Sequence, residues 1–286
     1  MRTVTKADIV AHGICAAGMA LCVVALALSF GRPAWGLLAI PALALYAAAA
    51  LRRPFRRMRL AREEFPAAWR EVLLRDVRFY RGLDGAGRAR FERDLRWFLD
   101  EHAIEGVDGV RVTGELRALI AAGAAVLLHG QPEWELPRGH TILVYPGSFD
   151  EEFRCAPRAP FDGQAHGQGP VIVARDAVQV GWRNPPDACN VVLHEFAHLM
   201  DMKSGGPNGV PRMLARAAVG EWIALIHAEM EKVNKGRSLL RPYAGENEAE
   251  FFAVAVEYFF GQPRLLRARH PELYGALARF FNQESA

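Results

Sequence analysis

The feature of this sequence that most limits its fold is a long uncharged stretch near the N-terminus. Residues 9–30 comprise 22 positions without Lys, Arg, Asp or Glu, and about 20 apolar residues are enough for a helix to cross a bilayer. Gly31-Arg32-Pro33 interrupts the helix, and residues 35–51 form a second uncharged run of 17 positions. The sequence therefore predicts a transmembrane helical hairpin. A cleaved signal peptide would leave the second run without a role; one span followed by an interfacial helix is a further alternative.

Positive charges predict how the hairpin is oriented. Six arginines lie within residues 52–62, whereas the turn carries only Arg32 and the N-terminus Arg2 and Lys6. Because cytoplasmic flanks retain Lys and Arg, we expect a multi-pass anchor in the inner (cytoplasmic) membrane with both termini in the cytoplasm. The arginine cluster is expected to contact membrane lipid head groups. A nucleic-acid patch is the alternative, but the position directly after a span favours lipid, and no nucleic-acid partner is expected.

The remaining sequence predicts one further domain. We expect residues 1–60 to form the hairpin and its basic flank, and residues 61–286 to form a domain large enough for its own core. The net charge of +3 is small and indicates no acidic partner. The four cysteines show no disulfide framework, which is compatible with a reducing compartment.

Residues 191–201, with the sequence VVLHEFAHLMD, predict a metal-binding helix. His194 and His198 are separated by four positions and share one helix face, so both imidazoles can bind one Zn²⁺. Glu195 lies beside that metal without being a ligand, and it can move a proton from an activated water to a leaving group. The other side chains are apolar and indicate a buried helix. Two core histidines bonded to backbone carbonyls are the alternative.

A second buried helix is predicted from about Asn247, a good N-cap residue. Glu250 follows three positions later and is the expected third metal ligand; a capping-box glutamate is its alternative role. Glu257 is a fallback ligand near the same face, but two helical turns place it too far away if Glu250 binds. Two histidines and one glutamate leave a fourth position open, as in catalytic zinc sites.

Two further residues are candidates for supporting roles. Asp201 follows His198 by three positions and is expected to accept a hydrogen bond from a ligating imidazole or to fix the helix end. An exposed acid there is the alternative, which the helix dipole disfavours. Tyr243 precedes the second helix, and its phenol can donate to a developing oxyanion. By pattern alone a loop tyrosine is more often a packing residue.

Hydrophobic periodicity predicts an α+β fold, mostly helical with a small sheet. Helices are expected over residues 66–83, 88–102, 113–128, 211–235 and 271–281. Strand character is found at residues 140–145 and 171–182, and residues 157–169 indicate a loop over the cleft.

The two helical motifs together resemble the Mlc titration factor A family of bacterial zinc metallopeptidases. The likeness extends over about residues 65–281 and includes Ile142-Leu-Val-Tyr145-Pro146, Asn190-Val-Val, Asn208-Gly-x-Pro211 and Pro271-x-Leu-Tyr274. Residues 243–252 are also similar to the catalytic domain of anthrax lethal factor. The resemblance implies a zincin-like domain of gluzincin type. His194, His198 and Glu250 would bind zinc, with Glu195 as general base and Tyr243 aiding the transition state.

The function expected from this resemblance is zinc-dependent hydrolysis of a peptide or protein substrate by a membrane-anchored enzyme. Residues 171–175, just before the metal helix, are expected to hold an extended peptide by strand addition. The alternative is a non-catalytic or dual-role regulator that sequesters a cytosolic transcriptional repressor, as the family name implies. The usual members of the family are soluble, so the hairpin is a departure from the family pattern.

Overall fold

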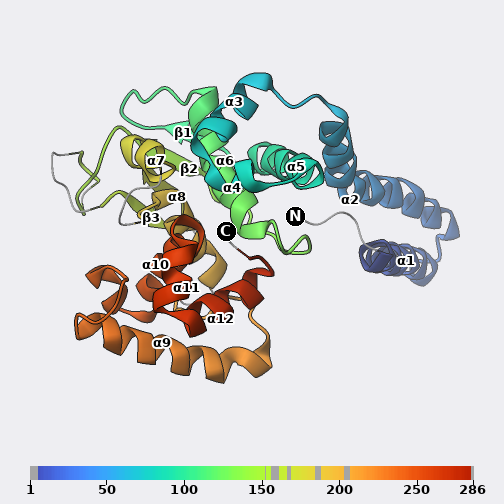
Figure 1. Ribbon diagram of the computed structural model, residues 1–286. Helices are drawn as coiled ribbons and strands as arrows, with labels where there is room; N and C mark the ends of the chain where they lie inside the picture. Colours follow the sequence, from blue (N-terminus) through green and yellow to red (C-terminus); the bar gives the residue numbers. More distant parts are fainter. Residues whose placement is uncertain are drawn as a thin grey trace. The chain divides into compact units, whose positions relative to one another are not determined.

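A computed structural model describes residues 6–151, 153–155, 161–165, 169–183, 188–202 and 207–284 (Figure 1). The chain divides into two compact units between Glu64 and Phe65. The first unit contains the two apolar runs, and the second contains the four strands found among the described residues and all of the candidate site residues.

The first unit is a pair of helices. Helix α1 (Lys6–Ser29) and helix α2 (Ala39–Arg62) pack against each other and are joined through the 3₁₀ helix η1 (Pro33–Leu38). Both contain segments long and apolar enough to cross a membrane, with only 6% of each apolar window buried. Helix α2 continues through Pro54 to the last arginine. The basic flank is therefore an extension of the second helix.

The second unit contains a four-stranded mixed sheet with the order β1-β2-β4-β3. Strands β1, β2 and β4 are parallel, and β3 pairs antiparallel to β4. All four residues of β4 are buried; this strand has a neighbour on each side and also contacts α7 and α8. The strands are β1 (Ile104–Gly106), β2 (Ile142–Tyr145), β3 (Gly163–Ala165) and β4 (Val171–Ala174).

Helices make up most of the second unit (Figure 1). Most residues of α6, α8 and α10 are buried. Helix α8 packs against α6, α10 and β3. Gly123 of α6 allows a close approach, since a Cβ there would lie 3.3 Å from the Phe196 ring of α8. The helices are α3 (Ala67–Asp76), α4 (Arg78–Gly82), α5 (Gly85–Glu101), α6 (Gly114–Leu128), α7 (Arg175–Gly181), α8 (Val191–Asp201), η2 (Arg216–Ala218), α9 (Val219–Asn234), η3 (Pro242–Gly245), α10 (Glu248–Gly261), α11 (Pro263–Arg269) and α12 (Pro271–Phe281).

The predicted fold class is confirmed: the unit is mostly helical with a small sheet. Several predicted boundaries are wrong. The strand expected over residues 171–182 ends at Ala174, and α7 follows because that segment buries only Val178. The helix expected over residues 66–83 breaks at Val77, whose ψ of 95° is not helical. The helix expected from residue 211 begins at Val219.

The segment predicted as a loop over the cleft contains a strand. Within residues 157–169, β3 occupies Gly163–Ala165 and pairs with β4. Residues 157–160 and 166–168 lie outside the described residues. This strand belongs to the sheet and contacts α8 directly.

Candidate metal centre

The candidate centre is built on α8, whose start is fixed by Asn190. The Oδ1 atom of Asn190 accepts the backbone N–H groups of Val192 and Leu193, both at 3.1 Å, which satisfies two donors that a helix start leaves free. All eleven residues of α8 are buried. His194 and His198 therefore project from a rigid, buried helix, with ring centroids 4.8 Å apart.

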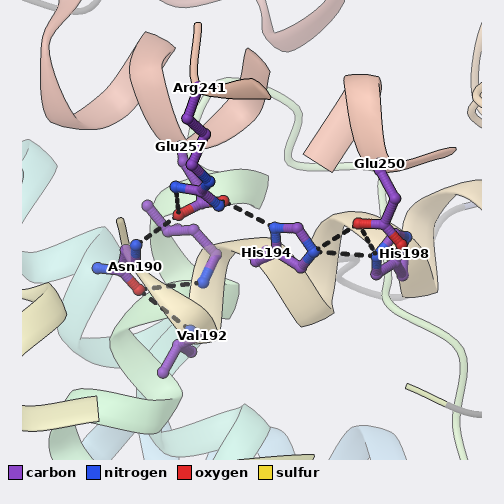
Figure 2. Close-up of polar contacts among 8 residues, drawn as sticks. Asn190, Val192, His194, His198, Arg241, Glu250 and Glu257 are labelled. Carbon is purple, nitrogen blue, oxygen red and sulfur yellow. Dashed lines mark hydrogen bonds and ion pairs between the residues drawn. The ribbon is translucent and has the colours of Figure 1, made fainter. Parts of the chain in front are cut away.

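Glu250 brings a carboxylate from α10 to these two imidazoles. Its Oε2 lies 3.0 Å from His194 Nε2 and 3.4 Å from His198 Nε2, and the two Nε2 atoms are 3.2 Å apart (Figure 2). Ligand atoms of a tetrahedral zinc, each about 2.0–2.2 Å from the ion, lie roughly 3.3 Å from one another. The donor set and its spacing therefore fit a zinc ion.

Glu257 is the hydrogen-bond partner of His194. The sequence had suggested Glu257 only as a fallback metal ligand and did not predict this role. Its Oε1 accepts the Nδ1–H of His194 at 2.7 Å, and its Oε2 accepts the backbone N–H of Asn190 at 2.5 Å. Arg241 donates to both oxygens. Such a carboxylate fixes the tautomer and ring orientation of a metal-binding histidine. One sequence signal could have revealed this role. Glu257 follows Glu250 by seven residues, which places both side chains on nearby faces of α10.

Glu195 lies next to the donor set and against strand β3. At Gly163, an added Cβ would lie 2.6 Å from Val191 Cγ2 and would also collide with the Glu195 carboxylate. Only a residue without a side chain allows this close approach. The Oε2 atom of Glu195 is buried and has no hydrogen-bond partner among the described residues. A buried polar atom without a partner is costly, so this carboxylate is available to a ligand.

The side chains of this centre shift one another's pKa values away from their usual ranges. Burial raises the pKa of Glu195 to about 7, although His194 and His198 act in the opposite direction. Burial lowers the pKa of His194, but hydrogen bonds to Glu250 and Glu257 outweigh it and raise the value to about 10. Burial also opposes ionisation of Glu250, yet the two histidines hold its pKa well below its usual range. The cluster of carboxylates therefore attracts positive charge.

Tyr243 and Asp201 lie at the edge of this cluster. Tyr243, in η3, places its ring centroid 5.9 Å from that of His194, and burial, Glu250 and Glu246 raise the pKa of its phenol. Asp201 is fully buried at the end of α8, and its Oδ2 accepts the backbone N–H groups of Asn208 and Gly209 at 2.7 and 2.5 Å. Its carboxylate therefore fixes the chain that follows α8. Among the described residues, Asp201 Oδ1 and His198 Nδ1 have no hydrogen-bond partner.

The helical fold, the small mixed sheet and the His-His-Glu set define a metallopeptidase-like domain. The chain belongs to the family described as "Glucose-regulated metallo-peptidase M90", whose profile matches residues 52–282. This confirms the family expected from the sequence motifs. The match includes the last helical turns of the first unit and nearly all of the second.

Curated relatives carry the same family resemblance. "Mlc titration factor A" of Edwardsiella ictaluri is 34% identical over 202 residues, covering 61% of this chain and 72% of that protein. The protein of the same name from Yersinia pestis is 29% identical over 248 residues, covering 77% and 86%. An uncharacterized protein of Synechocystis sp. is 30% identical over 243 residues, covering 79% and 88%.

Proposed function

We propose that this protein is a membrane-anchored, zinc-dependent peptidase. The observation that carries the proposal is the convergence of His194, His198 and Glu250 beside a buried carboxylate, Glu195, that has no hydrogen-bond partner among the described residues. A structural zinc site would need a fourth protein ligand. Among the described residues the cluster contains three candidate ligands.

His194, His198 and Glu250 would hold the metal. When bound there, a zinc ion polarises a carbonyl group and lowers the pKa of water. Glu195 takes the proton of the attacking water and delivers it to the leaving amine. Burial raises the pKa of Glu195 among the protein groups alone, and a cation held beside it would favour the ionised carboxylate, which is the form that acts as a base. Tyr243 donates its phenol hydrogen to the oxyanion that develops on the carbonyl oxygen.

The substrate is held along strand β3. The residues expected from the sequence for this role, 171–175, are excluded because β4 already pairs with β2 and β3. Just before β3, the C=O group of Asp162 accepts the N–H of Ala174 at 2.7 Å. The alternation of antiparallel pairing then directs the backbone groups of Gly163 and Ala165 away from β4. An extended peptide that pairs with this edge lies beside Glu195.

The N-terminal helices anchor this enzyme. Both are long and apolar enough to cross a membrane, and the arginines at the end of α2 keep the second unit on the cytoplasmic side. The same arginines contact anionic head groups. Substrates are therefore cytosolic polypeptides or cytosolic segments of membrane proteins.

A second candidate function is sequestration of a transcriptional repressor. The name of several relatives, "Mlc titration factor A", supports it. Binding alone does not require Glu195, so both functions can exist in one protein. Glu195→Gln separates them, because the amide keeps the shape of the side chain but cannot act as a base.

The test uses the full chain in lipid nanodiscs with a peptide library read by mass spectrometry. We expect cleavage that a chelator abolishes and added zinc restores. Glu195→Gln should retain its zinc content and lose cleavage, whereas Glu248→Gln, at a half-exposed position of the same region, should retain both. If zinc-loaded wild-type protein cleaves none of the library, hydrolysis is contradicted and repressor capture becomes the better hypothesis.

A further inference from the structure

Glu257 is a buried carboxylate that joins three parts of the candidate centre. It is fully buried on α10. Through Oε1 it holds His194, through Oε2 it holds the backbone at the start of α8, and Arg241 donates to both oxygens (Figure 2). A buried carboxylate that loses its cation leaves an uncompensated charge. The hydrogen bond that orients His194 therefore depends on Arg241.

Arg241 also fixes the turn that carries Tyr243. It immediately precedes η3, and its C=O accepts the N–H of Ala244 at 3.0 Å. Ala244 is fully buried, and a Cβ at Gly245 would lie 3.1 Å from Cγ of Asn234 in α9. The far end of the turn is thus held against α9, whereas the near end is held by the side chain of Arg241.

We propose that Arg241 is a positioning residue that couples the turn bearing Tyr243 to the carboxylate that orients His194. The inference rests on the hydrolytic function proposed above. Arg241 itself touches neither substrate nor metal. It acts on metal affinity through Glu257 and His194, and on turnover through the placement of Tyr243. One side chain thus aligns the metal ligand and the oxyanion donor.

The first test measures zinc affinity by competition with a chromophoric chelator, on the full chain in detergent. Arg241→Gln should weaken zinc binding about 10–100-fold, which is the usual effect of losing an outer hydrogen-bond partner of a metal ligand. Arg241→Lys keeps the charge but not the two-pronged donor, so its loss should be intermediate. Arg237→Gln, at an exposed position four residues before Arg241, is the matched control and should bind zinc as the wild type does.

The second test is a double-mutant cycle in kcat at saturating zinc. Arg241→Gln should lower kcat in the wild-type background with little change in KM, and it should lower kcat much less when Tyr243 is already Phe. A merely structural role predicts independent, multiplicative losses instead. If Arg241→Gln does not fold, as judged by circular dichroism, Arg241→Lys takes its place in both tests.

Two results would overturn the inference: wild-type zinc affinity in the folded variant, or multiplicative losses in kcat. Failure of the proposed function gives a different result. A wild-type protein that binds zinc but hydrolyses no peptide contradicts the peptidase, while the zinc-affinity test still decides whether Arg241 acts through His194.

Discussion

At the scale of single residues, each buried carboxylate of the candidate centre lies beside groups that offset its negative charge. Arg241 and two N–H donors surround Glu257. His194 and His198 offset the charge of Glu195 and Glu250. A bound cation would offset both carboxylates more completely than a proton on His194. Removal of one metal ligand should therefore lower metal affinity more than it lowers the stability of the fold.

Glu250→Gln tests this assignment of the third ligand. The amide removes the negative charge while keeping the side-chain length, so zinc affinity should fall by more than the roughly 10–100-fold that an outer hydrogen bond is worth. Glu248→Gln is the matched control, because the Glu248 side chain is half-exposed and contacts the exposed His227 at 3.1 Å. Chelator competition on both variants gives the comparison. Wild-type zinc affinity in Glu250→Gln would reject Glu250 as a ligand.

At the scale of elements, local signals predicted the helices that carry the centre but not their partners. The apolar run of residues 191–201 predicted α8, and Asn247 predicted the start of α10. The His-x-x-x-His spacing predicted which imidazoles face each other, because helix geometry alone fixes it. The bond from Asn190 to Glu257 joins residues 67 positions apart. No local pattern encodes such a pair, nor the contact of β3 with Glu195.

Gly163→Ala tests the contact between β3 and α8. A methyl group there collides with the Glu195 carboxylate and with Val191, so the general base or the strand must move. A displacement of about 1 Å can reduce turnover about 10²-fold, and zinc content should stay unchanged because the ligands lie on other residues. Gly147→Ala is the control, since a Cβ there meets nothing within 4 Å. Full activity in Gly163→Ala would show that Glu195 does not need this position.

The contact between α5 and α6 predicts a pH dependence of stability. His129 ends α6, and its Nε2 lies 2.8 Å from an Arg90 Nη2 of α5. Burial, then Arg90 and Arg93, lower the pKa of His129 to about 4, below its unfolded value of about 6.5. Between these values the unfolded chain binds the proton first, so stability falls as pH falls through this window and is unaffected above it.

His129→Gln should remove this dependence. The wild type should lose on the order of 1 kcal/mol of unfolding free energy from this group between pH 7 and pH 5.5, and the variant should lose correspondingly less. Thermal unfolding followed by tryptophan fluorescence at several pH values measures the difference. His227→Gln, at an exposed histidine, should follow the wild-type curve. Parallel curves for wild type and His129→Gln would contradict the low pKa.

At the scale of the whole molecule, the chain combines a metallopeptidase-family domain with two apolar helices. Only 6% of each apolar window is buried, a pattern that would suit helices in a lipid environment. The family match begins at Arg52, where the arginines of α2 start. The family match therefore includes the basic last turns of α2 as well as the second unit.

This organisation predicts that both ends of the chain are cytoplasmic. Six arginines within residues 52–62 follow the second apolar run, against Arg32 alone in the connecting turn, and Lys and Arg resist translocation. Reporter fusions placed after Leu60 and after Ala286 should both give a cytosolic signal. Replacing the six arginines with glutamine should weaken this preference, whereas Arg32→Gln should not. A periplasmic signal from either fusion in the unmodified chain would reject the topology and, with it, the cytosolic substrates proposed here.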